Sequence, residues 1–256
     1  MATGNRVLLC NCEDAGIGGE ECRRAVRDGL RARGIPFVAL PDLCRLAANH
    51  DGALRELAHG GTLTIIACHP RAVQGMLVAA GITPDESRLR LLDLRTMAAD
   101  AILDAISEAS AVEMPTADHD DWRPWFPVID YARCSNCGQC LSFCLFGVYS
   151  RSPDGNVVVT NPRACKYNCP ACARICPQVA IMFPKLGDQE SPLNGDVITD
   201  DENLKARARV NAGELLGDDL YAALAQRRQQ ARKRLLKTQQ ERQAEAERAT
   251  CSTTKD

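Results

Sequence analysis

The chain has 256 residues, 45% of them hydrophobic, which is enough for one large domain or two smaller domains with buried cores. Its formal net charge of -2 gives no general attraction to nucleic acid, and no run reaches the roughly 18 to 20 apolar residues that cross a bilayer, so no membrane insertion is expected. Because the first residues lack a secretory signal, we expect the fourteen cysteines to be reduced thiols in a cytoplasmic protein.

The first part of the chain has the pattern of a parallel sheet covered by helices. The expected strands are Arg6–Leu9, Pro36–Leu40, Thr62–Ala67 and Leu89–Leu94. The expected helices begin near Gly19, His50 and Arg71, and a fourth spans Thr96–Ser110. Four strands and four helices predict a small α/β domain with a doubly wound parallel sheet over residues 1–112.

Four cysteines lie where the expected strands end. Cys10 and Cys12 follow the first strand, Cys44 follows the second, and Cys68 ends the third. The carboxyl ends of parallel strands share one edge of the sheet, where doubly wound folds bind their ligands. This placement fits two interpretations: a third metal or cluster site, or free cysteines packed as small buried hydrophobes.

The sequence around these cysteines resembles the amino-terminal domain of heterodisulfide reductase A and its bacterial relatives. The resemblance covers about residues 6–82 and rests on Val7–Cys12, Leu43–Cys44 and Ile65–Arg71. These segments match a strand ending in Cys-x-Cys and a later strand ending in Ala-Cys-x-Pro-Arg. The family's domain is associated with an additional 4Fe-4S cluster, so the resemblance implies a third cluster with Cys10, Cys12, Cys44 and Cys68 as candidate ligands. The large flavin-binding domain of the full-length family members is not found in this sequence.

A linker is expected at residues 113–127, where three prolines and four acidic residues interrupt the pattern. It carries Trp122 and Trp125, which we expect to pack the flanking domains together because large aromatic side chains bury much area.

Eight cysteines in two runs form the strongest pattern in the sequence. The first run is Cys134-x2-Cys137-x2-Cys140-x3-Cys144, and the second is Cys165-x3-Cys169-x2-Cys172-x3-Cys176-Pro177. In runs of this kind three thiolates wrap one iron-sulfur cubane and the fourth reaches across to the other. Zinc sites usually hold their ligands as two separated pairs, which this spacing does not match.

The spacing divides the eight cysteines into two crossed ligand sets. One set is Cys134, Cys137, Cys140 and Cys176, and the other is Cys144, Cys165, Cys169 and Cys172. The two runs are therefore expected to fold as one unit that holds two 4Fe-4S clusters.

Residues 128–183 resemble the bacterial two-cluster ferredoxins. Two departures remove no ligand: Leu145 follows the first run in place of proline, and three residues separate Cys165 from Cys169. We expect an α+β domain over residues 128–184, with strands at Val148–Tyr149, Val157–Val159 and Ile181–Phe183 and a hairpin turn at Pro153–Asn156.

Residues 185–199 have the composition of a loop, and residues 200–256 that of a charged helical tail with an apolar stripe at Leu216, Leu220 and Leu224. The tail also holds a basic cluster of Arg227, Arg228, Arg232, Lys233, Arg234 and Lys237. A solvated helical face is the preferred interpretation of this cluster, over contact with nucleic acid or an acidic partner. Cys22 and Cys251 are expected to be unliganded. His69, beside Cys68, could replace a thiolate as a ligand, but a polar loop residue is the preferred interpretation.

These patterns predict a non-catalytic iron-sulfur protein, a ferredoxin-type relay in a soluble heterodisulfide-reductase-like oxidoreductase complex. The expected partners are redox subunits: a flavin- or hydrogenase-type donor and a reductase acceptor. One alternative is a catalytic oxidoreductase that binds a flavin or nicotinamide cofactor in the first domain, near Gly16–Gly19, although the G-x-G-x-x-G spacing is not met there. A second alternative is a nucleic-acid-binding protein with structural clusters.

Overall fold

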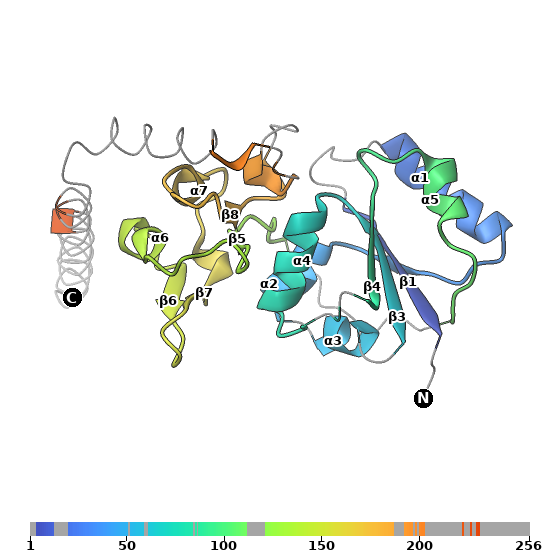
Figure 1. Ribbon diagram of the computed structural model, residues 1–256, viewed down its shortest axis with the longest axis horizontal. Coiled ribbons are helices and arrows are strands. Elements are labelled where there is room, and N and C mark those ends of the chain that lie inside the picture. Colours follow the sequence, from blue (N-terminus) through green and yellow to red (C-terminus); the bar gives the residue numbers. More distant parts are fainter. Residues whose placement is uncertain are drawn as a thin grey trace, which may run out of the picture.

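The computed structural model describes residues 4–12, 20–50, 52–58, 61–83, 85, 87–111, 121–186, 192–196, 198, 200–202, 222, 226, 229 and 230. Within these residues, a four-stranded sheet with its helices is followed along the chain by two small two-stranded sheets (Figure 1). No helix in this described part of the chain is both long enough and apolar enough to span a bilayer.

The large sheet is parallel throughout. Its strands are β1 (Asn5–Cys10), β2 (Val38–Leu40), β3 (Thr62–Ala67) and β4 (Leu89–Asp93), in the spatial order β2-β1-β3-β4. Leu8 of β1 pairs with Val38 on one side and with Ile65 on the other. All four strands expected from the sequence are present, because continuous Val, Ile and Leu runs suit strands that are buried on both faces.

Helices cover both faces of this sheet (Figure 1). On one face, α1 (Glu20–Ala32) and α5 (Ala99–Asp104) pack with Leu9 and other strand residues. On the opposite face, α2 (Leu43–Ala48), α3 (Gly52–Ala58) and α4 (Pro70–Ala79) pack with Leu8 and its neighbours. Successive strand residues thus enter opposite cores, and the predicted parallel sheet with covering helices is confirmed.

The sequence missed one helix and predicted another too long. The helix predicted near His50 is present as α3, but the chain between β2 and β3 also holds α2, which was not predicted. Asp42 accounts for the additional helix, because its Oδ1 accepts hydrogen bonds from the backbone N–H groups of Cys44 and Arg45, at 2.9 and 3.3 Å. The helix predicted over Thr96–Ser110 is confined to α5, because the following chain turns back along β1, where the Ser110 N–H donates to the Asn5 carbonyl at 2.7 Å.

The part of the chain that holds both cysteine runs, the cysteine-rich region, folds around two antiparallel strand pairs. β5 (Val128–Ile129) pairs with β8 (Ile181–Met182), and β6 (Tyr149–Arg151) pairs with β7 (Val157–Val159). The remaining elements are α6 (Gln139–Phe143), α7 (Ala171–Arg174) and the 3-10 turns η1 (Pro162–Ala164) and η2 (Pro192–Asn194). The predicted hairpin between β6 and β7 is confirmed, and its turn places Gly155 at a φ of 81°.

The two tryptophans before β5 pack in different places. Trp122 packs against the core beneath α2 and α4, and the Arg163 guanidinium lies 4.7 Å from the centroid of its ring. Trp125 belongs to the core of the cysteine-rich region and stacks on Phe183, with ring centroids 5.2 Å apart. This short segment therefore contributes apolar area to both halves of the molecule, as expected from the sequence.

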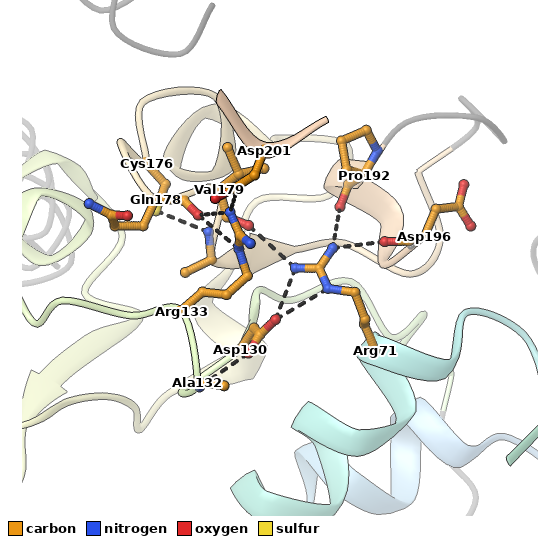
Figure 2. Close-up of polar contacts among 11 residues, drawn as sticks. Arg71, Asp130, Ala132, Arg133, Cys176, Gln178, Val179, Pro192, Asp196 and Asp201 are labelled. Atoms are coloured by element: carbon orange, nitrogen blue, oxygen red, sulfur yellow. Dashed lines mark hydrogen bonds and ion pairs between the residues drawn. The ribbon is translucent and has the colours of Figure 1, made fainter. Parts of the chain in front are cut away.

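Arg71, near the start of α4, links the sheet region to the cysteine-rich region (Figure 2). Its guanidinium donates to Asp130 Oδ2 at 3.0 and 3.2 Å and to the Asp196 carbonyl at 2.8 Å. It also lies 3.4 Å from the carbonyls of Val179 and Pro192. The Arg71 and Asp130 side chains are only 17% and 15% exposed, so this pair is largely shielded from water. The planar fork of arginine suits a position where several acceptors must be reached at once.

Gly75 of α4 lets β5 come close to the helix. A Cβ atom at this position would lie 2.7 Å from Val128 Cγ1 and 3.0 Å from the Ile129 carbonyl oxygen. A backbone oxygen cannot move aside as a flexible side chain can, so even one methyl group would push the two halves apart.

We expect Gly75→Ala to destabilise the protein by about 1 to 3 kcal/mol, since overpacking here outweighs the gain in helix propensity. The measurement is the thermal midpoint of anaerobically purified protein. Gly52→Ala in α3 is the matched control, because a Cβ atom there meets nothing within 4 Å. Equal midpoints for the two variants would show that the close approach at Gly75 has no energetic weight.

Candidate metal centres

The eight cysteines of the two runs line two separate cavities. One cavity is lined by Cys134, Cys137, Cys140 and Cys176. The other is lined by Cys144, Cys165, Cys169 and Cys172. Each run therefore places its last cysteine in the cavity of the other run, which is the grouping that the spacing predicts.

Residues with left-handed backbone conformations curl the chain around these cavities. Asn136 and Gly138, with φ of 54° and 78°, turn the backbone between the first three cysteines of the first run. Asn168, with φ of 58°, does the same between Cys165 and Cys169. Asparagine tolerates this conformation better than most residues, and Asn136 is further held because its Oδ1 accepts a hydrogen bond from the Val157 N–H at 3.1 Å. The longer spacing of the second run is thus accommodated by a turn.

Hydrogen-bond donors reach a sulfur atom in each of these cavities. The Ala180 N–H donates to Cys176 Sγ at 3.3 Å, and the buried Tyr149 hydroxyl donates to Cys172 Sγ at 3.1 Å. Donors of this kind stabilise negative charge on a cluster and so tune its reduction potential. From the sequence, Tyr149 is predicted only as a strand residue, because nothing in the local pattern shows that its hydroxyl contacts a cysteine 23 positions away.

Burial raises the pKa of several of these thiols. The pKa of Cys140 is raised to about 12, mainly by loss of solvent and further by the nearby Cys176. The pKa of Cys165 is raised to about 12 by burial and then by Cys144 and Cys169. Such thiols stay protonated at neutral pH unless a bound cation stabilises the thiolate, so this donor set suits a metal cluster that binds thiolates.

No three Cys, His, Asp or Glu side chains within the described ranges converge closely enough to hold a single metal ion. The sulfur ligands of one zinc ion must all lie about 2.3 Å from it. Thiolates around an iron-sulfur cubane enclose a larger object and stand farther apart, so a cluster does not need the close convergence that a single metal ion requires.

The four cysteines at the carboxyl edge of the parallel sheet line one further cavity. Cys10, Cys12, Cys44 and Cys68 border the same space. It lies at the ends of β1 and β3, from which the chain winds in opposite directions, and doubly wound folds bind ligands at such a position. Four thiols border this cavity, as four thiols border each of the two cavities described above, so its side chains could supply a full ligand set for one cluster.

The thiols of this four-cysteine cavity are deeply buried. Loss of solvent raises the pKa of Cys10 to about 12, and negative charge on Cys12 and Asp42 adds to the effect. Burial also raises the pKa values of Cys44 and Cys68. Neighbouring acidic groups and the other cysteines of the cavity raise these pKa values further. Like the eight cysteines above, this set would need a bound metal to hold its members as thiolates.

A buried ion pair borders the four-cysteine cavity. Lys185 Nζ donates to Asp42 Oδ2 at 2.6 Å, and the two side chains are only 9% and 10% exposed. Burial alone would lower the pKa of Lys185, but negative charge on Cys44, Asp42 and Cys12 raises it on balance. Lys185 follows β8, so the cysteine-rich region supplies a cation to a cavity of the other region. No pattern in the sequence points to either Asp42 or Lys185.

His69 does not line the four-cysteine cavity, although it adjoins Cys68. Its ring is fully buried, and Nδ1 lies 2.8 Å from Asp196 Oδ1 and 2.8 Å from Arg95 Nη1. Burial lowers the pKa of His69 despite the opposing hydrogen bond to Asp196. His69 therefore helps, like Arg71, to anchor the segment that ends at Asp196.

The remaining predicted features lie elsewhere. Cys22 is half-buried on α1, with its Sγ 3.8 Å from the Met97 carbonyl. Cys251, Gly16–Gly19, the leucine stripe and the basic cluster of the tail lie outside the described residues.

Comparison with known proteins identifies the cysteine-rich region. Residues 126–210 match the family model of the 4Fe-4S dicluster domain. A stretch of 61 residues is 51% identical to an uncharacterized ferredoxin of Methanocaldococcus jannaschii. That match covers 23% of this chain, and this chain spans only about two fifths of the relative, 41% of its length.

The chain therefore contains a ferredoxin-type domain, an iron-sulfur module of the electron-transfer class. The predicted pair of 4Fe-4S clusters is confirmed by this match.

We expect Tyr149→Phe to lower the reduction potential of one of the two clusters by roughly 40 mV, since a hydrogen bond worth about 1 kcal/mol to a ligand sulfur is lost. The measurement is a redox titration followed by electron paramagnetic resonance. Tyr167→Phe is the control, because that side chain is 54% exposed. An unchanged potential in Tyr149→Phe, or the same shift in both variants, would contradict this role of the hydroxyl.

Proposed function

We propose that this protein is an iron-sulfur relay in which Cys134, Cys137, Cys140 and Cys176 hold one 4Fe-4S cluster, and Cys144, Cys165, Cys169 and Cys172 hold the other. The observation that carries the proposal is the crossed grouping of these eight side chains in two cavities. A cluster held in this way exchanges single electrons and needs no other catalytic group.

We further propose a third 4Fe-4S cluster at Cys10, Cys12, Cys44 and Cys68. Two observations support it: the four thiols border one cavity, and that cavity lies at the ligand-binding edge of the sheet. The resemblance of residues 6–82 to the amino-terminal domain of heterodisulfide reductase A points to the same residues.

The arrangement of side chains favours one order for the three centres. Cys44, Trp125 and Phe183 line one small hollow. Trp125 also faces Tyr167, with ring centroids 5.5 Å apart. In the sequence, Tyr167 stands between Cys165 and Cys169 of the second run. Of the eight cysteines in the two runs, all within the described residues, Cys165 alone packs against the core that contains Cys10 and Cys44. We infer that electrons pass between the four-cysteine cavity and the cluster at Cys165, with the cluster at Cys134 farther along.

Such a chain of centres suits a protein that connects a donor to an acceptor. We propose that it works in a heterodisulfide-reductase-like oxidoreductase complex, between a flavin- or hydrogenase-type donor and a reductase. We propose that it does so in a reducing compartment such as the cytoplasm, where cysteines stay reduced until they bind a cluster.

The content of iron and acid-labile sulfide per chain tests the third cluster. After anaerobic purification we expect about twelve of each, four for every 4Fe-4S cluster. Cys68→Ser should lower both values by about four, because it removes a thiolate from a buried ligand set. Cys22→Ser is the matched control, since Cys22 lies outside the three cavities. About eight iron atoms in the unaltered protein would rule out the third cluster and leave the two-cluster relay in place.

A further inference from the structure

The Asp42–Lys185 ion pair is placed to act on the four-cysteine cavity. Lys185 lines that cavity together with Cys10, Cys12, Cys44 and Cys68. Asp42 is in contact with the same set, because Cys12 Sγ lies 3.9 Å from Asp42 Oδ2 and the Cys44 N–H donates to Asp42 Oδ1 at 2.9 Å. One cation and one anion are thus buried beside the same four sulfur atoms.

Charges at such a site change the free energy of adding an electron. Reduction of a 4Fe-4S cluster with four thiolates adds one electron and one negative charge, and no covalent bond forms or breaks. A nearby ammonium stabilises the added charge, whereas a nearby carboxylate opposes it. The effect is large here because both side chains are about nine-tenths buried, where water screens charge poorly.

The pair also crosses between the two halves of the molecule. Asp42 lies between β2 and α2 of the parallel-sheet region, and Lys185 follows β8 of the ferredoxin-type domain, 143 positions later. Lys185 reaches the cavity only when the two halves are in contact.

We propose that the Asp42–Lys185 pair sets the reduction potential of the centre at Cys10, Cys12, Cys44 and Cys68, and that Lys185 makes this potential depend on the contact between the two halves. This inference rests on the third cluster proposed above. Both residues act as positioned charges and need not bind iron. Arg23 also lines the cavity, so loss of Lys185 should shift the potential while a second cation remains.

The test is a redox titration of the full-length protein followed by electron paramagnetic resonance, with iron content measured on each sample. Lys185→Met leaves a buried anion, so the equilibrium constant for reducing the third centre should fall at least about tenfold, or about 59 mV for one electron. Asp42→Asn should shift the same constant upward, because the asparagine oxygen can still cap α2 while the negative charge is lost.

Two further variants serve as controls. Lys185→Arg keeps the charge and should leave the potential near that of the unaltered protein. The double variant Asp42→Asn/Lys185→Met removes both charges and should bring the potential back toward it. The two clusters of the ferredoxin-type domain should change little in all four variants.

The outcomes separate this inference from the third cluster itself. About twelve iron atoms in the unaltered protein, with no shift or a shift of the same sign in Lys185→Met and Asp42→Asn, would overturn the role of the pair and leave the third cluster in place. If Lys185→Met loses its third centre, the role of the pair is tested by the other two variants. The reduction potential of the third centre should rise in Asp42→Asn and should return toward that of the unaltered protein in the double variant. About eight iron atoms in the unaltered protein would overturn both proposals.

Discussion

The contact between Arg71 and Asp130 fixes how the two halves of this protein face each other. The Arg71 guanidinium joins α4 to Asp130, just before the first cysteine run, and to the backbone at Asp196. Gly75 lets β5 lie against the same helix. That docking brings Lys185 beside Asp42 and places Trp125 and Phe183 next to Cys44. Without it, the parallel sheet and the ferredoxin-type domain would be two separate modules on one chain.

Burial of sulfur is the second constraint on the structure. The raised pKa values of Cys10, Cys140 and Cys165 mean that, without a bound metal, these cavities would hold neutral thiols, which attract one another only weakly. Metal binding must displace those protons, so the affinity for iron and the stability of the fold are linked. The small cores of the ferredoxin-type domain, built on strands of two or three residues, would gain the most from this coupling.

Local patterns predicted the strands of the parallel sheet and the two-cluster character of the second half, because both are encoded in short repeats of residue type. The convergence of Cys10, Cys44 and Cys68 was also within reach, since strand ends of a parallel sheet share an edge. The partners of Asp42 and Tyr149 were not, because Lys185 and Cys172 come from distant segments and no periodicity links them. The short helix α2 was missed for a local reason: the capping role of Asp42 was not recognised.

The crossing of Cys144 and Cys176 between the two cavities has a consequence for assembly and damage. With the ligand sets proposed above, each loop would be anchored partly by the centre that the other loop surrounds, and neither loop would be fully ordered by one centre alone. Loading of the pair would then be cooperative, and oxidative loss of one centre would loosen a ligand of the other. The ferredoxin-type domain would be found mainly as fully loaded or fully empty protein.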